Sequence, residues 1–176
     1  MLNPIEYKIK EYELLCSLVS VEEIVQWADE EILRSDELDE MVMDLSLAND
    51  EDKQYKVFSQ LDSKYESEAF DSVAFNIAEL YDNKALDFHE VSSKLILMSY
   101  HSVNLSSDQM DFCNWIDDET CLIAQGIKEQ VPAEVELKGF MEIVKSKHNQ
   151  RLQSDLWPLS PFVQKSAQKA PLASGS

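Results

Sequence analysis

The sequence predicts an all-α protein, a single compact bundle of about seven to eight short helices followed by an irregular, proline-containing C-terminal arm. Three observations support this prediction. Helix-capping residues recur along the chain, apolar residues repeat at the spacing of one helical face, and only 3 of the 176 residues are glycine. Strand-like alternation of apolar and polar residues never lasts beyond a few positions. The length suits one domain with a sizeable core.

Each expected helix begins at a residue that can cap it. Such residues accept a hydrogen bond from a backbone N–H in the first turn, and an acid or amide three positions later completes a capping box. A last helix is expected to begin at Pro132, after Gly126 has ended the helix before it. The other expected starts are Asn3-Pro4, Ser20 with Glu23, Ser35 or Asp36, Asn49 or Asp50, Ser67, Asp87 with Glu90, and Ser106 with Gln109.

Apolar periodicity assigns a buried face to these helices. The run from Leu95 to Met98 is apolar on all sides, which predicts that the helix over 88–103 is central and buried on most sides. The remaining apolar faces are Val21, Ile24, Val25, Ala28 and Ile32; Leu38, Met41, Val42 and Leu45; Phe70, Val73, Ala74, Ile77 and Tyr81; and Leu137, Phe140, Met141 and Val144.

The chain changes character near residue 152. Residues 1–151 carry the helical pattern, whereas residues 152–176 contain three prolines and few acids and are net basic. We therefore expect a helical domain over 1–151 and an irregular or partly disordered arm over 152–176.

Several classes of protein are excluded at this stage. The N-terminal sequence has neither an apolar core nor a small-residue cleavage site, so we expect no signal peptide and a cytoplasmic location. No window approaches 18 consecutive apolar residues, so no membrane span is expected. The cysteines Cys16, Cys113 and Cys121 are odd in number and lack paired spacing, which predicts buried, reduced thiols and no disulfide framework.

The net charge of −19 is the most informative feature of the composition. A chain this acidic repels nucleic acid and anionic membranes, and its natural partner is a basic protein surface. The acids are concentrated in residues 19–52, which hold 13 acidic residues and one basic residue, Arg34. Like charges crowded on neighbouring helices reduce stability, so a surface of this kind favours a binding role.

Helical geometry turns many of these acids outward. Glu23 and Glu30 point away from the predicted core face of the second helix, and Glu40 and Asp44 away from that of the third. Trp27 lies at the flank of the second helix, where two interpretations remain open: it packs under a neighbouring helix, or it is an aromatic anchor within an acidic rim. The predicted partner-binding residues are Glu23, Trp27, Glu30, Glu31, Asp36, Glu37, Asp39, Glu40 and Asp44.

The chain shows no catalytic or metal-binding motif. Its three histidines lack the spacings of zinc or di-iron sites, and three glycines cannot form a phosphate-binding loop. The triple acid Asp117–Glu119 lacks the spacing of a calcium loop. Spacing alone leaves a Cys113–His101 nucleophile pair open. We expect a protein that is not an enzyme and that binds no cofactor and no metal.

One stretch resembles a known family. Residues 13–29, with the pattern S-V-E-E followed by W-A-D, and the later acids Asp117–Glu119 are similar in style to small, acidic, helical immunity proteins of bacterial polymorphic-toxin systems, including contact-dependent growth inhibition. The resemblance covers roughly the first 125 residues, and the proline-rich arm departs from it. It implies that the protein binds one cognate toxin and covers its active site or substrate cleft, and that the toxin is a basic nuclease such as a tRNA-cleaving RNase of the EndoU type.

Three functions therefore remain after the sequence has been considered; the last is an enzyme with an unrecognised helical site, which a metal or cofactor in the purified protein would favour. The first is a monomeric immunity protein that neutralises a basic nuclease toxin in a 1:1 complex. The alternative is an acidic nucleic-acid mimic that inhibits a DNA-binding protein. A mimic is expected to space its carboxylates over a long face, whereas here they cluster on about two helices, which favours the first function.

Overall fold

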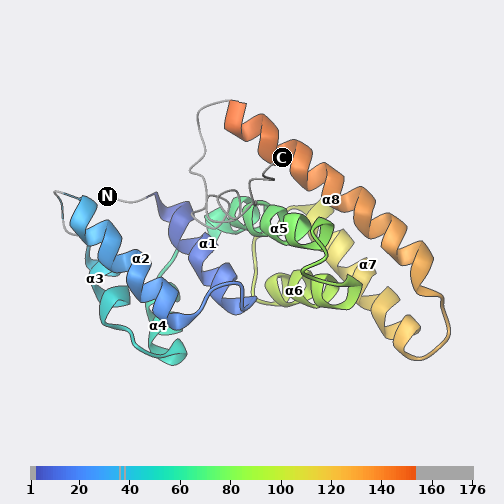
Figure 1. Cartoon of the computed structure of the whole chain (residues 1–176), viewed down its shortest axis with the longest axis horizontal. Helices are drawn as coiled ribbons and strands as arrows, with labels where there is room; N and C mark the ends of the chain where they lie inside the picture. Colours follow the sequence, from blue (N-terminus) through green and yellow to red (C-terminus); the bar gives the residue numbers. More distant parts are fainter. Residues whose placement is uncertain (1–2, 36, 38, 154–176) are drawn as a thin grey trace, which may run out of the picture.

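The computed structural model describes residues 3–35, 37 and 39–153, and this part of the chain is helical throughout, without strands. The all-α prediction is confirmed. Eight α-helices and one 3₁₀ turn follow in order along the described residues (Figure 1). They are α1 (Pro4–Leu15), α2 (Val21–Arg34), α3 (Glu40–Leu47), α4 (Glu51–Phe58), η1 (Ser63–Tyr65), α5 (Glu66–Asp82), α6 (Phe88–Tyr100), α7 (Ser107–Ala124) and α8 (Gln130–Gln153).

Most of the predicted caps are present. Ser20, Asp87 and Ser106 each form a complete capping box with the residue three positions later. Asn3 caps α1 by accepting a hydrogen bond from the backbone N–H of Ile5 at 3.1 Å. Gly126 has a φ of +71°, the left-handed conformation that ends a helix and favours glycine.

Three helix starts differ from the sequence prediction. Ser67 does not open the fifth helix: α5 begins at Glu66 after Tyr65, without a side-chain cap, and Ser67 lies inside it. The third helix begins after Asp39, whose carboxylate accepts from the backbone N–H of Met41 at 3.1 Å, and neither Ser35 nor Asp36 opens it. The last helix begins at Gln130 and carries Pro132 in its first turn, where the missing N–H breaks no intrahelical bond. Its end at Gln153 lies two residues beyond the expected domain limit, and residues 154–176 of the predicted arm lie outside the described residues.

The helices enclose two apolar cores that share α1. The larger core is built from α1, α5, α6, α7 and α8, and contains the fully buried Phe70 and Leu95. The smaller core lies where α2, α3 and α4 pack against the other side of α1, and contains Ile24 and Leu45. In Figure 1 the smaller group occupies the left end of the molecule, and α8 runs from the right edge to the top of the view. The run over 95–98 behaves as predicted at Leu95 and Met98, which are fully buried.

Buried charged residues lie between the two cores. Lys8, Lys10 and Glu13 of α1 are all at most 6% exposed. Lys10 Nζ lies 2.5 Å from Glu13 Oε2, and the Asn76 amide donates to Glu13 Oε1 at 3.2 Å. Lys8 Nζ pairs with Glu11 at 2.6 Å and approaches Glu66 at 3.6 Å. Because buried charges are tolerated only when they are paired, these contacts fix how α1 sits against α5.

The assignment of the larger core predicts that a buried and an exposed apolar residue differ clearly in how much their replacement by alanine destabilises the fold. We expect Phe70→Ala to lower the free energy of unfolding by about 3–5 kcal/mol, because the substitution leaves a cavity at a fully buried site. Ile143→Ala on α8 is the control, since Ile143 is 56% exposed, and its cost should stay within about 0.5 kcal/mol. Urea unfolding followed by circular dichroism measures both, and equal costs would contradict this core assignment.

Candidate functional site

Helices α2 and α3 form an antiparallel pair at the end of the molecule farthest from α8 (Figure 1). The Ser46 hydroxyl donates a hydrogen bond to the Asp29 carboxylate across the pair. This bond fixes the register of the two helices. Leu33 follows Asp29 by one turn of α2, and Met43 precedes Ser46 by about one turn of α3. Because the helices are antiparallel, this register aligns Leu33 with Met43.

The outward side of this pair is acidic. Glu30, Glu37, Glu40 and Asp44 are all exposed. Arg34 is the one Lys or Arg in residues 21–47. We call this exposed surface, with Asp29, the acidic face; because Arg34 is the one local cation for its five carboxylates, it presents negative potential to solvent.

Arg34 neutralises only part of the negative charge at the C-terminal end of α2. Its Nη1 lies 2.6 Å from Glu31 Oε1, and its Nη2 lies 3.8 Å from Glu30 Oε2. The guanidinium side chain is 69% exposed, so both pairs are screened by solvent and contribute little to stability.

Further carboxylates gather beneath the acidic face, around Tyr7 of α1. The Tyr7 hydroxyl is buried and makes no well-formed hydrogen bond, although the Asp39 carboxylate lies close enough to act on it. Burial and the charges of Asp39, Glu6 and Glu31 raise the pKa of Tyr7. Burial and the charge of Glu31 likewise raise the pKa of Glu6. The junction of α1, α2 and α3 is thus crowded with negative charge.

Trp27 is not a surface anchor. Its side chain is 9% exposed and packs edge-on against Tyr7, with ring centroids 5.8 Å apart. Lys10 Nζ lies 5.9 Å from the centre of its ring. The interpretation in which Trp27 packs under a neighbouring helix is therefore correct, because α1 covers the flank of α2 on which it lies.

Other predicted residues have local roles. Glu23 completes the capping box of α2, with its carboxylate accepting from the Ser20 backbone N–H at 2.9 Å. Asp39 caps α3 and is only partly exposed. Glu31 is half-buried beside Arg34. Asp36 lies outside the described residues. The structure thus brings Glu30, Glu37, Glu40 and Asp44 together on the acidic face.

The sequence analysis missed three exposed apolar side chains within the acidic face. Leu33 is 87% exposed, Leu47 is 78% exposed, and Met43 is 40% exposed. The helical wheel that turned Glu30 and Asp44 outward also turns these residues outward, so their position could have been found from periodicity. We call Leu33, Met43 and Leu47 the apolar trio.

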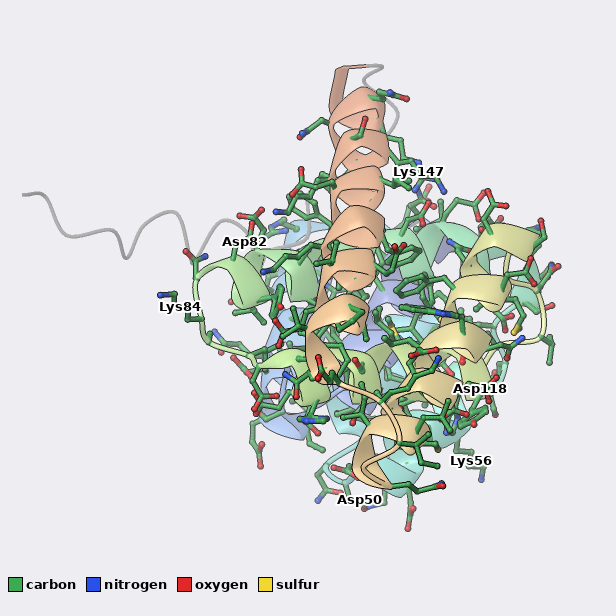
Figure 2. The ribbon with its side chains drawn as sticks, turned by 90° about the vertical axis from the view of Figure 1, so that its right-hand side faces the viewer. Asp50, Lys56, Asp82, Lys84, Asp118 and Lys147 are labelled. Atoms are coloured by element: carbon green, nitrogen blue, oxygen red, sulfur yellow. The ribbon has the colours of Figure 1, made fainter. Side chains whose placement is uncertain are left out.

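The opposite end of the molecule carries mixed charge. Figure 2 shows this end from the α8 side, with Lys84 and Lys147 on the same surface as Asp82 and Asp118. Lys145 of α8 forms ion pairs with Asp82 and Glu142, and Lys128 lies 2.5 Å from Glu119. Several acids there form ion pairs with lysines, whereas Arg34 is the one Lys or Arg beside the acidic face.

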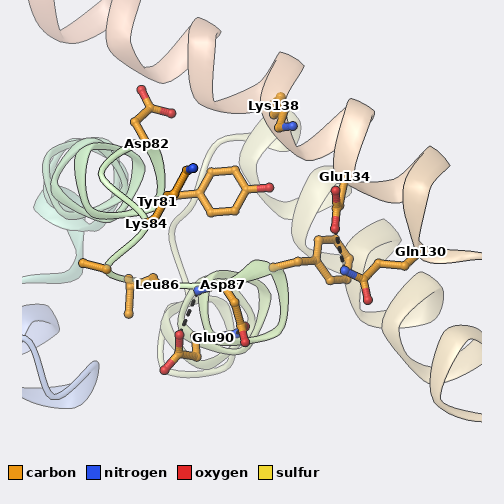
Figure 3. A pocket seen from close by; sticks show the side chains of 11 residues that line it. Tyr81, Asp82, Lys84, Leu86, Asp87, Glu90, Gln130, Glu134 and Lys138 are labelled. Carbon is orange, nitrogen blue, oxygen red and sulfur yellow. Dashed lines mark hydrogen bonds between the residues drawn. The ribbon is translucent and has the colours of Figure 1, made fainter.

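A hollow of about 550 Å³ lies between the α5–α6 turn and the start of α8 (Figure 3). Its acids are already engaged: Glu90 accepts from the Asp87 backbone N–H at 2.8 Å, and Glu134 accepts from the Gln130 amide. Two lysines, Lys84 and Lys138, face its four acids, so the hollow keeps a net negative charge. The lining contains no cysteine, histidine or serine, so no Ser–His or Cys–His pair can form in it.

The cysteines do not form a reactive site. Cys16 and Cys113 are buried, and their thiols donate to the backbone carbonyls of Lys94 and Leu95. Burial raises the pKa of each thiol to about 12, which keeps both protonated at neutral pH. A Cys113–His101 nucleophile pair therefore has no activated thiol. Cys121 is exposed, contrary to the expectation that all three thiols are buried.

Comparison with known proteins adds no family. No family model, curated protein or solved structure matches the chain. Within the described residues, no group of three or more His, Cys, Asp or Glu side chains is placed to hold a metal ion. None of the helices described combines the length and apolar character required to cross a bilayer. The acidic face is the feature on which a functional proposal can be built.

The acidic face should reduce the stability of the fold. Asp44 follows Glu40 by one turn of α3, so Asp44→Lys replaces repulsion by an attractive pair in the favourable order. It also places a cation near the helix C-terminus. We expect a gain of roughly 0.5–1 kcal/mol in the free energy of unfolding at low ionic strength, shrinking as salt is added.

Glu136→Lys on α8 is the matched control for this prediction. It makes the same change of charge on an exposed helical residue, but no charged residue lies three or four positions away on either side. Its effect should be small at every salt concentration. A loss of stability from Asp44→Lys at low salt would show that Asp44 is already neutralised in the folded protein.

Proposed function

We propose that the protein binds a basic protein through the acidic face. The observation that carries the proposal is the concentration of exposed carboxylates on α2 and α3 with Arg34 as their one local cation. Such a surface attracts a basic partner from a distance and accelerates its association by roughly 10- to 1,000-fold. The surface at the α8 end, where acids and bases are paired, would not have this effect.

We further propose that the partner is a nuclease toxin and that the protein is its immunity protein. A nuclease needs a basic cleft to bind phosphates, so its substrate site is complementary to the acidic face. The resemblance of residues 13–29 to immunity proteins supports a cognate toxin, for which a tRNA-cleaving RNase of the EndoU type is the model. In this proposal the protein acts in the cytoplasm as a non-enzymatic monomer that covers the substrate cleft in a 1:1 complex.

The dimensions of the acidic face favour this function over nucleic-acid mimicry. An α-helix rises about 1.5 Å per residue, so the 14 residues of α2 span about 21 Å and the 8 residues of α3 about 12 Å. A duplex mimic would need a longer row of carboxylates, because its partner contacts phosphates along the helix axis. The exposed Leu33 and Leu47 have no counterpart in a phosphate backbone.

The decisive variant reverses four charges together: Glu30→Lys, Glu31→Lys, Glu40→Lys and Asp44→Lys. We expect it to slow association with the proposed cognate toxin domain by at least about 10-fold and to flatten the salt dependence of the rate. Truncating a carboxylate that is buried against a toxin cation should cost roughly 2–5 kcal/mol, and truncating one at the rim far less. Stopped-flow binding over a salt series measures the rates, and nuclease assays measure protection.

A second fourfold variant controls for net charge. Asp111→Lys, Asp118→Lys, Glu129→Lys and Glu136→Lys change the total charge by the same amount on exposed residues of α7, of α8 and of the turn between them. This variant should retain most of the wild-type rate. If both variants bind the toxin domain as the wild type does, with intact folds, then the acidic face is not the binding site. A partner that proves to be a DNA-binding protein would instead support mimicry.

A further inference from the structure

We propose that the apolar trio anchors the bound partner on the acidic face. The trio and the carboxylates around it together select a partner patch made of apolar side chains ringed by lysine or arginine. This inference rests on the proposed function and specifies the chemistry of its partner. It assigns the steps of binding to different residues: the carboxylates govern the rate of association, and Leu33, Met43 and Leu47 govern the lifetime of the complex.

The geometry of α2 and α3 places the three side chains together. The Asp29–Ser46 hydrogen bond sets the register of the two helices on their exposed side. Leu33 lies one turn after Asp29, and Met43 lies one turn before Ser46, so these two side chains are neighbours across the pair. Leu47 follows Met43 by one turn on the same side of α3. This register assigns all three side chains to the same exposed side of the helix pair.

The exposure of the trio is unusual for its setting. Leu33 and Leu47 are among the most exposed large apolar residues in the part of the chain that the structure describes, at 87% and 78%. A single exposed leucine is ordinary on a protein surface. Three exposed apolar side chains on one side of a charged helix pair instead resemble an interface, which has an apolar centre and a polar rim. The rim here consists of Glu30, Glu37, Glu40 and Asp44.

The charge of the rim identifies the occupant. An acidic rim attracts a basic patch and repels a second copy of this chain, whose net charge is −19. It also opposes a purely apolar partner, because binding would desolvate the carboxylates without pairing them. An amphipathic basic surface is complementary to both the rim and the trio, since its cations pair with the rim carboxylates while its apolar side chains cover the trio.

The test uses two synthetic peptides as probes. One is an amphipathic helical peptide of leucine and lysine, and the other has serine in place of every leucine and the same charge. The protein variant is Leu33→Ser with Met43→Ser, which removes apolar surface at exposed positions. We expect the wild type to bind the leucine–lysine peptide roughly 10- to 100-fold more tightly than the serine–lysine peptide, the gain from burying one or two leucine-sized side chains.

The variant should lose most of this preference while its affinity for the serine–lysine peptide and the salt dependence of binding stay near wild-type values. The matched control is Val135→Ser with Ile143→Ser, because these residues are similarly exposed on α8, at 62% and 56%. The control should keep the wild-type preference. Thermal unfolding of each variant, which should match the wild type, confirms that the folds are intact.

Different results would overturn different claims. If the Leu33→Ser, Met43→Ser variant keeps the full preference for the leucine–lysine peptide, or if the α8 control loses it, the trio is not the anchor. The proposed function would still stand if the fourfold charge reversal on α2 and α3 slowed association with the toxin domain. If that reversal has no effect on association and the trio variant still loses the peptide preference, the patch binds amphipathic cations and the toxin proposal falls.

Discussion

The structure depends on α1 being covered on both of its sides. Tyr7 and Leu14 face the smaller core, whereas Ile9 and Tyr12 face the larger one. A helix in this position cannot leave its charges in water, and the pairing of Lys10 with Glu13 at 2.5 Å is the consequence. Truncating one member of such a buried pair costs about 3–5 kcal/mol, because it strands the other charge. Lys10 Nζ also lies 5.9 Å from the centre of the Trp27 ring, so the pair sits at the contact between α1 and α2.

The residues that stabilise the fold and those of the proposed binding surface lie in different parts of the molecule. The larger core, around Phe70 and Leu95, lies away from the acidic face, so α2 and α3 can carry unfavourable surface charge without disturbing it. Trp27 belongs to the supporting structure, since it packs on Tyr7 and holds α2 against α1. The exposed carboxylates and the apolar trio lie on the other side of the same two helices. Their shared surface combines exposed carboxylates with exposed apolar side chains.

The fold was largely predictable because its signals are local. The capping boxes at Ser20, Asp87 and Ser106 and the 3.6-residue periodicity act within a few residues of sequence. The start of α3 was not predictable in this way, since Ser35, Asp36 and Asp39 can all cap a helix and tertiary packing selects among them. Trp27 was ambiguous because its burial depends on α1, which approaches from outside its own helix. The exposure of Leu33 could have been predicted from a helical wheel of α2, but attention to the neighbouring acids hid it.

Amide hydrogen exchange, mapped in the free protein and in its complex with the proposed toxin partner, tests the proposed binding surface most directly. Exchange reports local opening and burial along the chain. The account predicts that binding slows exchange most over residues 29–47, where the acidic face and the apolar trio lie, and leaves α8 unchanged. Protection confined to α8, or to the hollow near Tyr81 and Glu134, would contradict it.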